Sequence, residues 1–150
     1  MLSADQSSQG RYAIARQAGR TLMVSVTDDG GGSWRPPVVA AEVPANATGF
    51  GHRAMKFSPR GNLAIIWKAA YADGSFDVWS SVSRDGARTF KTIRVSHAVS
   101  PPYLIDRGNF MFGDDLSSVE VDEQFVHVVW GDNRAGFQGT WYGRIPLSAY

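Results

Sequence analysis

A short pattern of residues occurs twice in this chain and limits its fold more than any other feature. The pattern is Ser/Thr-x-Asp-x-Gly-x-Ser/Thr followed by an aromatic residue, and the second copy carries Ala87 in place of the glycine. The Asp carboxylate can accept hydrogen bonds from its own loop, and glycine permits a positive φ, so each copy predicts a tight turn between two strands. We expect a structural role for the residues at the fixed positions, namely Thr27, Asp29, Gly31, Ser33 and Trp34, and then Ser83, Asp85, Thr89 and Phe90. Both aromatic residues are predicted to pack between neighbouring units.

The segments around these turns have the periodicity of β-strands, and they recur in units. Trp67 and Trp130 end equivalent apolar runs about 60 residues apart, a spacing typical of repeat architectures. The run 63–68 is apolar up to its last residue, Lys68, and predicts a strand buried on both faces. The segment 77–83 alternates as a half-exposed strand does. The predicted fold is all-β: a β-propeller of four-stranded antiparallel blades, with about two and a half blades present.

The predicted organisation is a flexible N-terminus over 1–10 and a partial propeller over 11–150. The predicted blades cover approximately 11–43, 53–96 and 115–150. The first shows strands two to four and the last shows strands one to three. A partial ring leaves open sheet edges, which invite pairing. We therefore expect either that a missing N-terminal part completes the propeller or that the chain associates with another copy.

Composition excludes several classes of function. The net charge of +1, with Lys and Arg scattered, argues against a nucleic-acid partner, because phosphate binding requires a basic surplus. The chain has no cysteine and only three histidines, none at a metal-ligand spacing, so we predict no metal and no cofactor. No apolar run reaches the roughly 20 residues of a membrane helix, and the polar start of the chain is not a signal peptide.

The two turns resemble the Asp-boxes of the bacterial neuraminidase repeat, found in sialidases and their relatives. The stretch 126–145 (VHVVWGDNRAGFQGTWYGRI) is similar to the closing region of exported bacterial sialidase-like propellers. The resemblance covers the chain from about residue 11 onward. It implies a sialidase-like propeller, a glycan partner such as a sialoside, an exported or extracellular location, and Asp-boxes on the face away from the active site.

Candidate binding residues lie on the loops predicted for the opposite face. A sialidase needs an arginine cluster for the substrate carboxylate and an Asp as general acid/base. Asp114 and Asp115 are the candidates for the acid/base, with a capped turn as the alternative. The candidates for substrate binding are Arg53, Arg107, Asp132 and Arg134. For these the alternatives are solvated or salt-bridged arginines and, at 132–134, a self-bonded turn.

Two functions follow as hypotheses. The first is a sialidase-like glycan-binding propeller that forms part of an exo-α-sialidase, a glycoside hydrolase. The alternative is a non-catalytic propeller that serves as a carbohydrate- or protein-binding scaffold. A propeller of the photosystem-assembly type, which has similar repeats, is a third class that the sequence leaves open. The chain alone is not expected to hold a complete active site.

Overall fold

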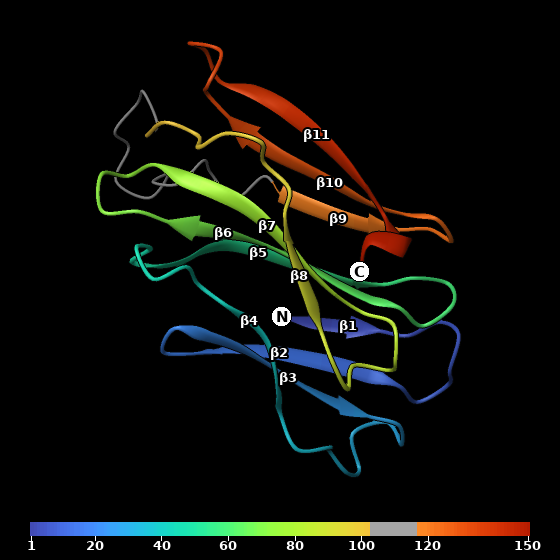
Figure 1. Ribbon diagram of the computed structural model, residues 1–150. Coiled ribbons are helices and arrows are strands. Elements are labelled where there is room, and N and C mark those ends of the chain that lie inside the picture. The colour runs from blue at the N-terminus through green and yellow to red at the C-terminus, as the bar shows by residue number, and fades with distance from the viewer. Residues whose placement is uncertain (103–116) are drawn as a thin grey trace.

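The computed structural model describes residues 1–102 and 117–150, and these residues form almost only β-strands (Figure 1). The two strands predicted at 63–68 and 77–83 fall on observed ones. The strands are β1 (Leu2–Ala4), β2 (Tyr12–Ala18), β3 (Thr21–Thr27), β4 (Val38–Glu42), β5 (Gly49–Phe57), β6 (Leu63–Ala70), β7 (Phe76–Ser83), β8 (Lys91–Arg94), β9 (Ser117–Val121), β10 (Phe125–Asp132) and β11 (Gly139–Pro146), followed by a 3-10 turn, η1 (Leu147–Ala149).

The strands form three antiparallel sheets in chain order, which confirms the predicted all-β class. Sheet 1 has the order β1-β2-β3-β4, sheet 2 has β5-β6-β7-β8, and sheet 3 has β11-β10-β9. Sheet 2 lies between the other two (Figure 1). The first strands β1, β5 and β9 contact one another in sequence, so the three sheets converge along their first strands.

β1 lies within the segment 1–10, for which the sequence predicted no strand. Leu2–Ala4 pair with β2, with Leu2 opposite Ile14, and the amino group of Met1 donates to the carbonyl of Ala15 at 2.8 Å. The strand has only three residues in a Ser- and Gln-rich stretch, so its periodicity is too short to recognise. Sheet 1 therefore has four strands and not the predicted three. The last sheet has three described strands, as expected.

Two layers of apolar side chains hold the sheets together. Leu63, Ile65 and Trp67 point from β6 toward sheet 1, while Ala64 and Ile66 point toward sheet 3. Every residue of β6 is buried, which confirms the prediction of a strand covered on both faces.

The burial of β7 contradicts the prediction of a half-exposed strand at 77–83. All but one of its residues are buried, although their alternation predicted a half-exposed strand. The reason is that serines fill the small positions of a strand that lies inside the stack. The hydroxyl of Ser81, for example, accepts a hydrogen bond from the indole N–H of Trp67 at 3.0 Å.

The two repeated turns have the same internal hydrogen bonds. Asp29 accepts bonds from the hydroxyls of Thr27 (2.7 Å) and Ser33 (2.6 Å), and Asp85 accepts bonds from those of Ser83 (2.7 Å) and Thr89 (2.6 Å). Each turn joins the third and fourth strands of its sheet. Ala87 adopts a φ of 62°, so the second turn keeps the left-handed conformation without glycine.

The aromatic residues of the turns do not behave alike. Phe90 packs against the core between sheets 1 and 2, whereas Trp34 is 41% exposed and does not fill an interface as predicted. Arg35 makes the connection between units instead. It pairs with Asp28 of its own turn and donates from Nη1 to the carbonyl of Gly86 in the next turn at 2.8 Å.

Candidate functional site

The connections between strands lie at two opposite ends of the sheets because successive strands run antiparallel. One end carries the two Asp turns, and we call it the turn end. The other end carries the connections from second to third strands and from each sheet to the next, and we call it the loop end. Its described segments are 19–20, 43–48, 71–75, 95–102 and 133–138. The loop end is where the sequence placed the binding residues.

An open hollow of about 590 Å³ lies at the loop end, where sheet 1 meets sheet 2. Its polar lining comes from three segments that are distant in sequence: the loop after β4, the turn between β6 and β7 with the start of β7, and the end of β8. The side chains that these segments contribute are Asn46, Tyr71, Asp73, Ser75, Asp77 and Arg94. Hydroxyl, amide, carboxylate and guanidinium groups therefore surround one opening, with an aromatic ring beside them.

Asp77 organises this hollow from below. Its carboxylate, 4% exposed, accepts hydrogen bonds from the hydroxyl of Tyr71 (2.8 Å), from Nη2 of Arg94 (2.5 Å) and from the hydroxyl of Ser96 (3.1 Å). Burial, followed by the hydrogen bond to Asp77, raises the pKa of Tyr71 to about 12. The Tyr71 hydroxyl is therefore protonated at neutral pH and is fixed as a donor to Asp77.

The turn between β6 and β7 forms one wall of the hollow. Asp73 accepts bonds from the backbone N–H and the hydroxyl of Ser75, and these hydrogen bonds hold the pKa of Asp73 below its usual value. Gly74, with a φ of 83°, completes the turn by donating to the carbonyl of Tyr71. The Asp73 carboxylate is thus ionised and exposed at the rim.

A second polar cluster lies at the loop end between sheets 2 and 3. Asp132, fully buried, accepts hydrogen bonds from the hydroxyl of Ser100 (2.5 Å), Nε1 of Trp130 (2.9 Å) and Nε of Arg134 (2.8 Å). Burial alone would raise the pKa of Asp132, but these donors, Arg134 first, outweigh it and hold the pKa below the usual value. The Arg134 guanidinium lies over Trp141, 4.8 Å from the ring centroid.

This cluster is closed by its own bonds. The backbone N–H of Arg134 donates to Asp132 at 2.9 Å, which is a self-bonded turn. The Arg134 side chain is only 10% exposed, and its Nη1 is buried without a hydrogen-bond partner among residues 1–102 and 117–150. Asn133 donates to the carbonyl of Pro102 at 2.6 Å. The cluster therefore ties the β10–β11 loop to the segment after β8 and offers few groups to a ligand.

Of the three predicted binding residues that the structure describes, Asp132 and Arg134 lie together and Arg53 lies apart from them. Arg53 lies on β5, donates to the side-chain oxygen of Gln17 on β2 at 2.6 Å, and faces the ring of Phe50. Burial lowers the pKa of Arg53. No described contact joins Arg53 to Arg134, so these two do not form an arginine cluster.

Arg107, Asp114 and Asp115 lie outside the described residues. The sequence-based reasoning also missed four residues of the loop end, namely Asn46, Asp77, Arg94 and Ser100. Asp77 did leave a signal, because a carboxylate between Phe76 and Val78 in a strand of buried residues needs partners.

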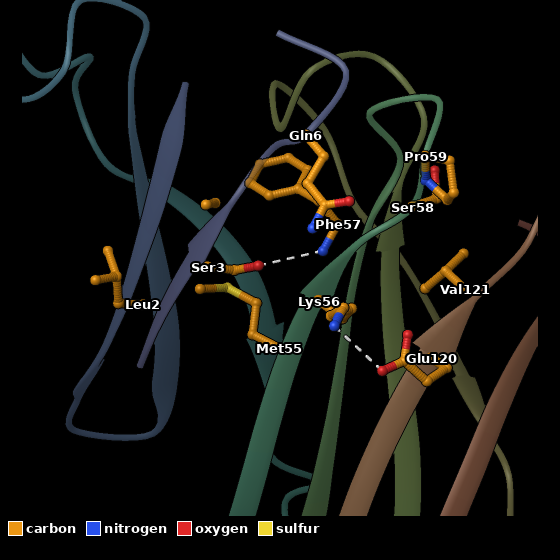
Figure 2. A pocket seen from close by; sticks show the side chains of 11 residues that line it. Leu2, Ser3, Gln6, Met55, Lys56, Phe57, Ser58, Pro59, Glu120 and Val121 are labelled. Atoms are coloured by element: carbon orange, nitrogen blue, oxygen red, sulfur yellow. Dashed lines mark hydrogen bonds and ion pairs between the residues drawn. The ribbon is translucent and has the colours of Figure 1, made fainter. Parts of the chain in front are cut away.

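A different hollow, of about 540 Å³, lies at the turn end beside the converging first strands (Figure 2). Figure 2 shows Lys56 of β5 paired with Glu120 of β9 at 3.2 Å, and the backbone N–H of Phe57 donating to the hydroxyl of Ser3 at 3.2 Å. Both charges in the pair are about half exposed or more and neutralise each other. These contacts connect the three sheets, and we assign them a structural role.

Residues 1–102 and 117–150 contain no group of three or more His, Cys, Asp or Glu side chains that could hold a metal ion. In the same residues no helix is long and apolar enough to cross a membrane.

Comparison with known proteins supports the fold. No family model matches the chain, and no curated protein matches it. A solved structure, the α-L-arabinanase of Penicillium chrysogenum in complex with arabinobiose, matches 94% of this chain with a TM-score of 0.58 and 14% sequence identity. The chain forms part of a β-propeller. The match spans 44% of the arabinanase chain, which is less than half of that protein.

The neighbour is an arabinanase and not a sialidase. The match therefore supports the propeller fold that the sequence predicted and gives no support to the sialidase family specifically. At this level of identity the similarity concerns the fold alone.

Proposed function

We propose that this part of a β-propeller binds glycans in the hollow formed by Tyr71, Asp77 and Arg94 at the loop end. The observation that supports the proposal most directly is the convergence of Asn46, Asp73 and Arg94 around one opening of about 590 Å³. The arabinanase with the same fold was solved with a sugar bound, which makes a carbohydrate the first class of ligand to consider.

The chemistry of the hollow suits sugar hydroxyls. A hydroxyl both donates and accepts hydrogen bonds, so a sugar site needs acceptors such as Asp73 and donors such as the Asn46 amide and the Arg94 guanidinium. The side chain of Arg94 is 36% exposed and can use its free N–H groups. Because Asp77 already neutralises Arg94, the site favours an uncharged sugar over one that carries a carboxylate.

A binding role agrees better with this hollow than catalysis does. A tyrosine nucleophile has to lose its proton, but the raised pKa of Tyr71 keeps that proton on the hydroxyl. Asp77 accepts three hydrogen bonds and lies beneath the surface, where a general acid/base could not reach a glycosidic oxygen. We therefore place the non-catalytic function first.

Exo-α-sialidase activity is the second candidate, and the two Asp turns favour it. Their hydrogen bonding is the same in both copies, so the repeat that resembles the Asp-box is a repeat of structure as well as of sequence. Arg134 would then grip a substrate carboxylate through its unpaired Nη1. Such a role requires Arg134 to open toward solvent.

Binding is tested by screening the protein against neutral and sialylated oligosaccharides and then measuring affinities by calorimetry. We expect Arg94→Ala and Asn46→Ala each to weaken binding of a neutral sugar, by about tenfold or more for Arg94, since a hydrogen bond to a charged group contributes roughly 1.5–3 kcal/mol. Arg60→Ala is the matched control, because Arg60 is exposed at the turn end and pairs with Glu123.

Unchanged affinity in both loop-end variants would place the site elsewhere. Release of the fluorophore from an aryl sialoside tests the second candidate. Turnover that is lost in Arg134→Ala would favour the sialidase, and sugar binding without turnover would exclude it for this chain.

A further inference from the structure

Within residues 1–102 and 117–150, the two outer sheets of the stack each present a face that no other segment covers. On sheet 1 the uncovered face carries Leu2, Tyr12, Ile14, Met23 and Val39, which share one side through their pairing register, and we call it the sheet-1 face. Four of them are strongly exposed, from 37% for Tyr12 to 68% for Leu2. Apolar groups at this density on one face are typical of interaction surfaces.

The opposite end of the stack carries the sheet-3 face. It carries Phe125, His127, Val129, Tyr142 and Pro146 on one side by register, together with the charged residues Arg144 and Glu120. Tyr142 is 58% exposed and its hydroxyl bonds to Nδ1 of His127 at 2.7 Å. β10 thus has apolar residues on both sides, as β6 does inside the stack.

The interior of the molecule shows what covers such faces. Sheet 1 packs its inner face on sheet 2, and sheet 2 packs its other face on sheet 3, each through a continuous apolar layer. The two uncovered faces are the remaining members of the same series. One sheet of the same kind on each side would continue the packing.

We propose that a second copy of this chain covers both faces. The sheet-1 face of each copy packs on the sheet-3 face of the other, and the two copies form one closed ring with a twofold axis. Three sheets per copy give six in the ring, inside the range of four to eight blades in which propellers close. Three sheets alone fall below that range.

The buried area favours the closed ring over a single contact. The strands of sheet 1 have three, seven, seven and five residues and those of sheet 3 have five, eight and eight, so each face covers roughly 350 Å². One such contact is small, since stable interfaces bury about 800 Å² per partner. Closing the ring buries two faces per copy, about 700 Å², which comes close to that size. Head-to-tail contacts that close also stop growth, whereas an open series would build filaments.

Sedimentation velocity and light scattering on the full chain test the proposal, which does not rest on glycan binding. We expect a dimer of twice the 16.3 kDa chain mass at micromolar concentration. Ile14→Asp and Tyr142→Asp should each raise the dimer dissociation constant at least about tenfold, because each buries a charge in both junctions of the ring. Phe137→Asp is the control, since Phe137 is 65% exposed on the β10–β11 loop, off both faces.

Three results would overturn the ring. They are a monomer at all concentrations, a series of species larger than the dimer, and a dimer sensitive to Ile14→Asp but not to Tyr142→Asp, which would indicate two sheet-1 faces in contact. Leu2→Asp provides a second variant on the sheet-1 face should Ile14→Asp fold poorly. Sugar affinity measured on the same samples separates failure of this proposal from failure of the binding site.

Discussion

The indole of Trp67 offers a sharp test of how the sheets are held together. Its ring is fully buried between sheets 1 and 2 and stacks on Trp79 at 5.5 Å, and its N–H donates to the hydroxyl of Ser81 at 3.0 Å. The Ser81 hydroxyl has a second partner, the hydroxyl of Thr92 at 2.8 Å. The bond is therefore asymmetric. Ser81 keeps a partner when the indole N–H is removed, but the N–H loses its acceptor when Ser81 is removed.

Ser81→Ala should lower the free energy of unfolding by about 1–3 kcal/mol, the cost of a buried donor without a partner. In a Trp67→Phe background the same substitution should cost less, because the indole donor is absent and only the bond to the Thr92 hydroxyl is lost. The double-mutant cycle, measured by urea unfolding, should thus give a coupling energy of about 1 kcal/mol or more. An equal cost of Ser81→Ala in both backgrounds would show that the hydrogen bond contributes nothing, and that the layer is held by shape alone.

Three further predictions concern carboxylates and a tyrosine. The hydrogen bond from His127, with two from backbone N–H groups, lowers the pKa of Asp122 to about 2, so its contribution to stability is complete above its unfolded pKa near 3.8 and is lost as the pH falls toward 2. As the pH falls over that interval, the urea concentration at the unfolding midpoint should decrease. This decrease should be smaller in Asp122→Asn than in the control variant Glu42→Gln. The pKa of Tyr71, about 12, predicts a late step in the ultraviolet titration that Tyr71→Phe removes, and a contribution to stability that is present below pH 10 and is lost as the pH rises through 12. Asp85→Ala should lower the free energy of unfolding by about 1–2 kcal/mol in urea, because two hydroxyls and two N–H groups of the turn lose their acceptor.

The features that the sequence predicted well are those set by local chemistry. The two turns need an acceptor, two donors and a left-handed residue within eight positions, and those residues are all in the sequence. The apolar run of β6 predicts a strand covered on both sides, because a strand with one face in solvent alternates apolar and polar residues. A strand covered on both sides needs a sheet on each side, and the repeat supplies the two neighbouring units. Together they predict three packed sheets.

The features that the sequence did not predict depend on contacts between distant segments. β1 has three residues and is defined by its partner β2, not by its own pattern. Trp34 was expected to connect neighbouring sheets, but Arg35 makes this connection. The Arg35 side chain is long enough to reach the carbonyl of Gly86 in the next sheet. Likewise, the alternation in β7 predicted which residues share a face of the strand. It did not predict that a neighbouring sheet covers the face that carries the serines.

The buried carboxylates explain why the loop end can act as a rigid binding surface. The segment that follows β8 crosses from one carboxylate to the other. Ser96 donates to Asp77 at 3.1 Å and Ser100 donates to Asp132 at 2.5 Å, while the backbone of Ser100 pairs with Phe76. Each carboxylate also holds an arginine, so the two charges are balanced where they are buried. A ligand in the hollow would then meet donors already held in place, and little side-chain entropy would be lost on binding. Asp77→Asn should therefore weaken sugar binding although Asp77 itself lies beneath the surface, because Arg94 would lose the charge that orients it. Sugar affinity that survives Asp77→Asn but not Arg94→Ala would show that Arg94 needs no such support.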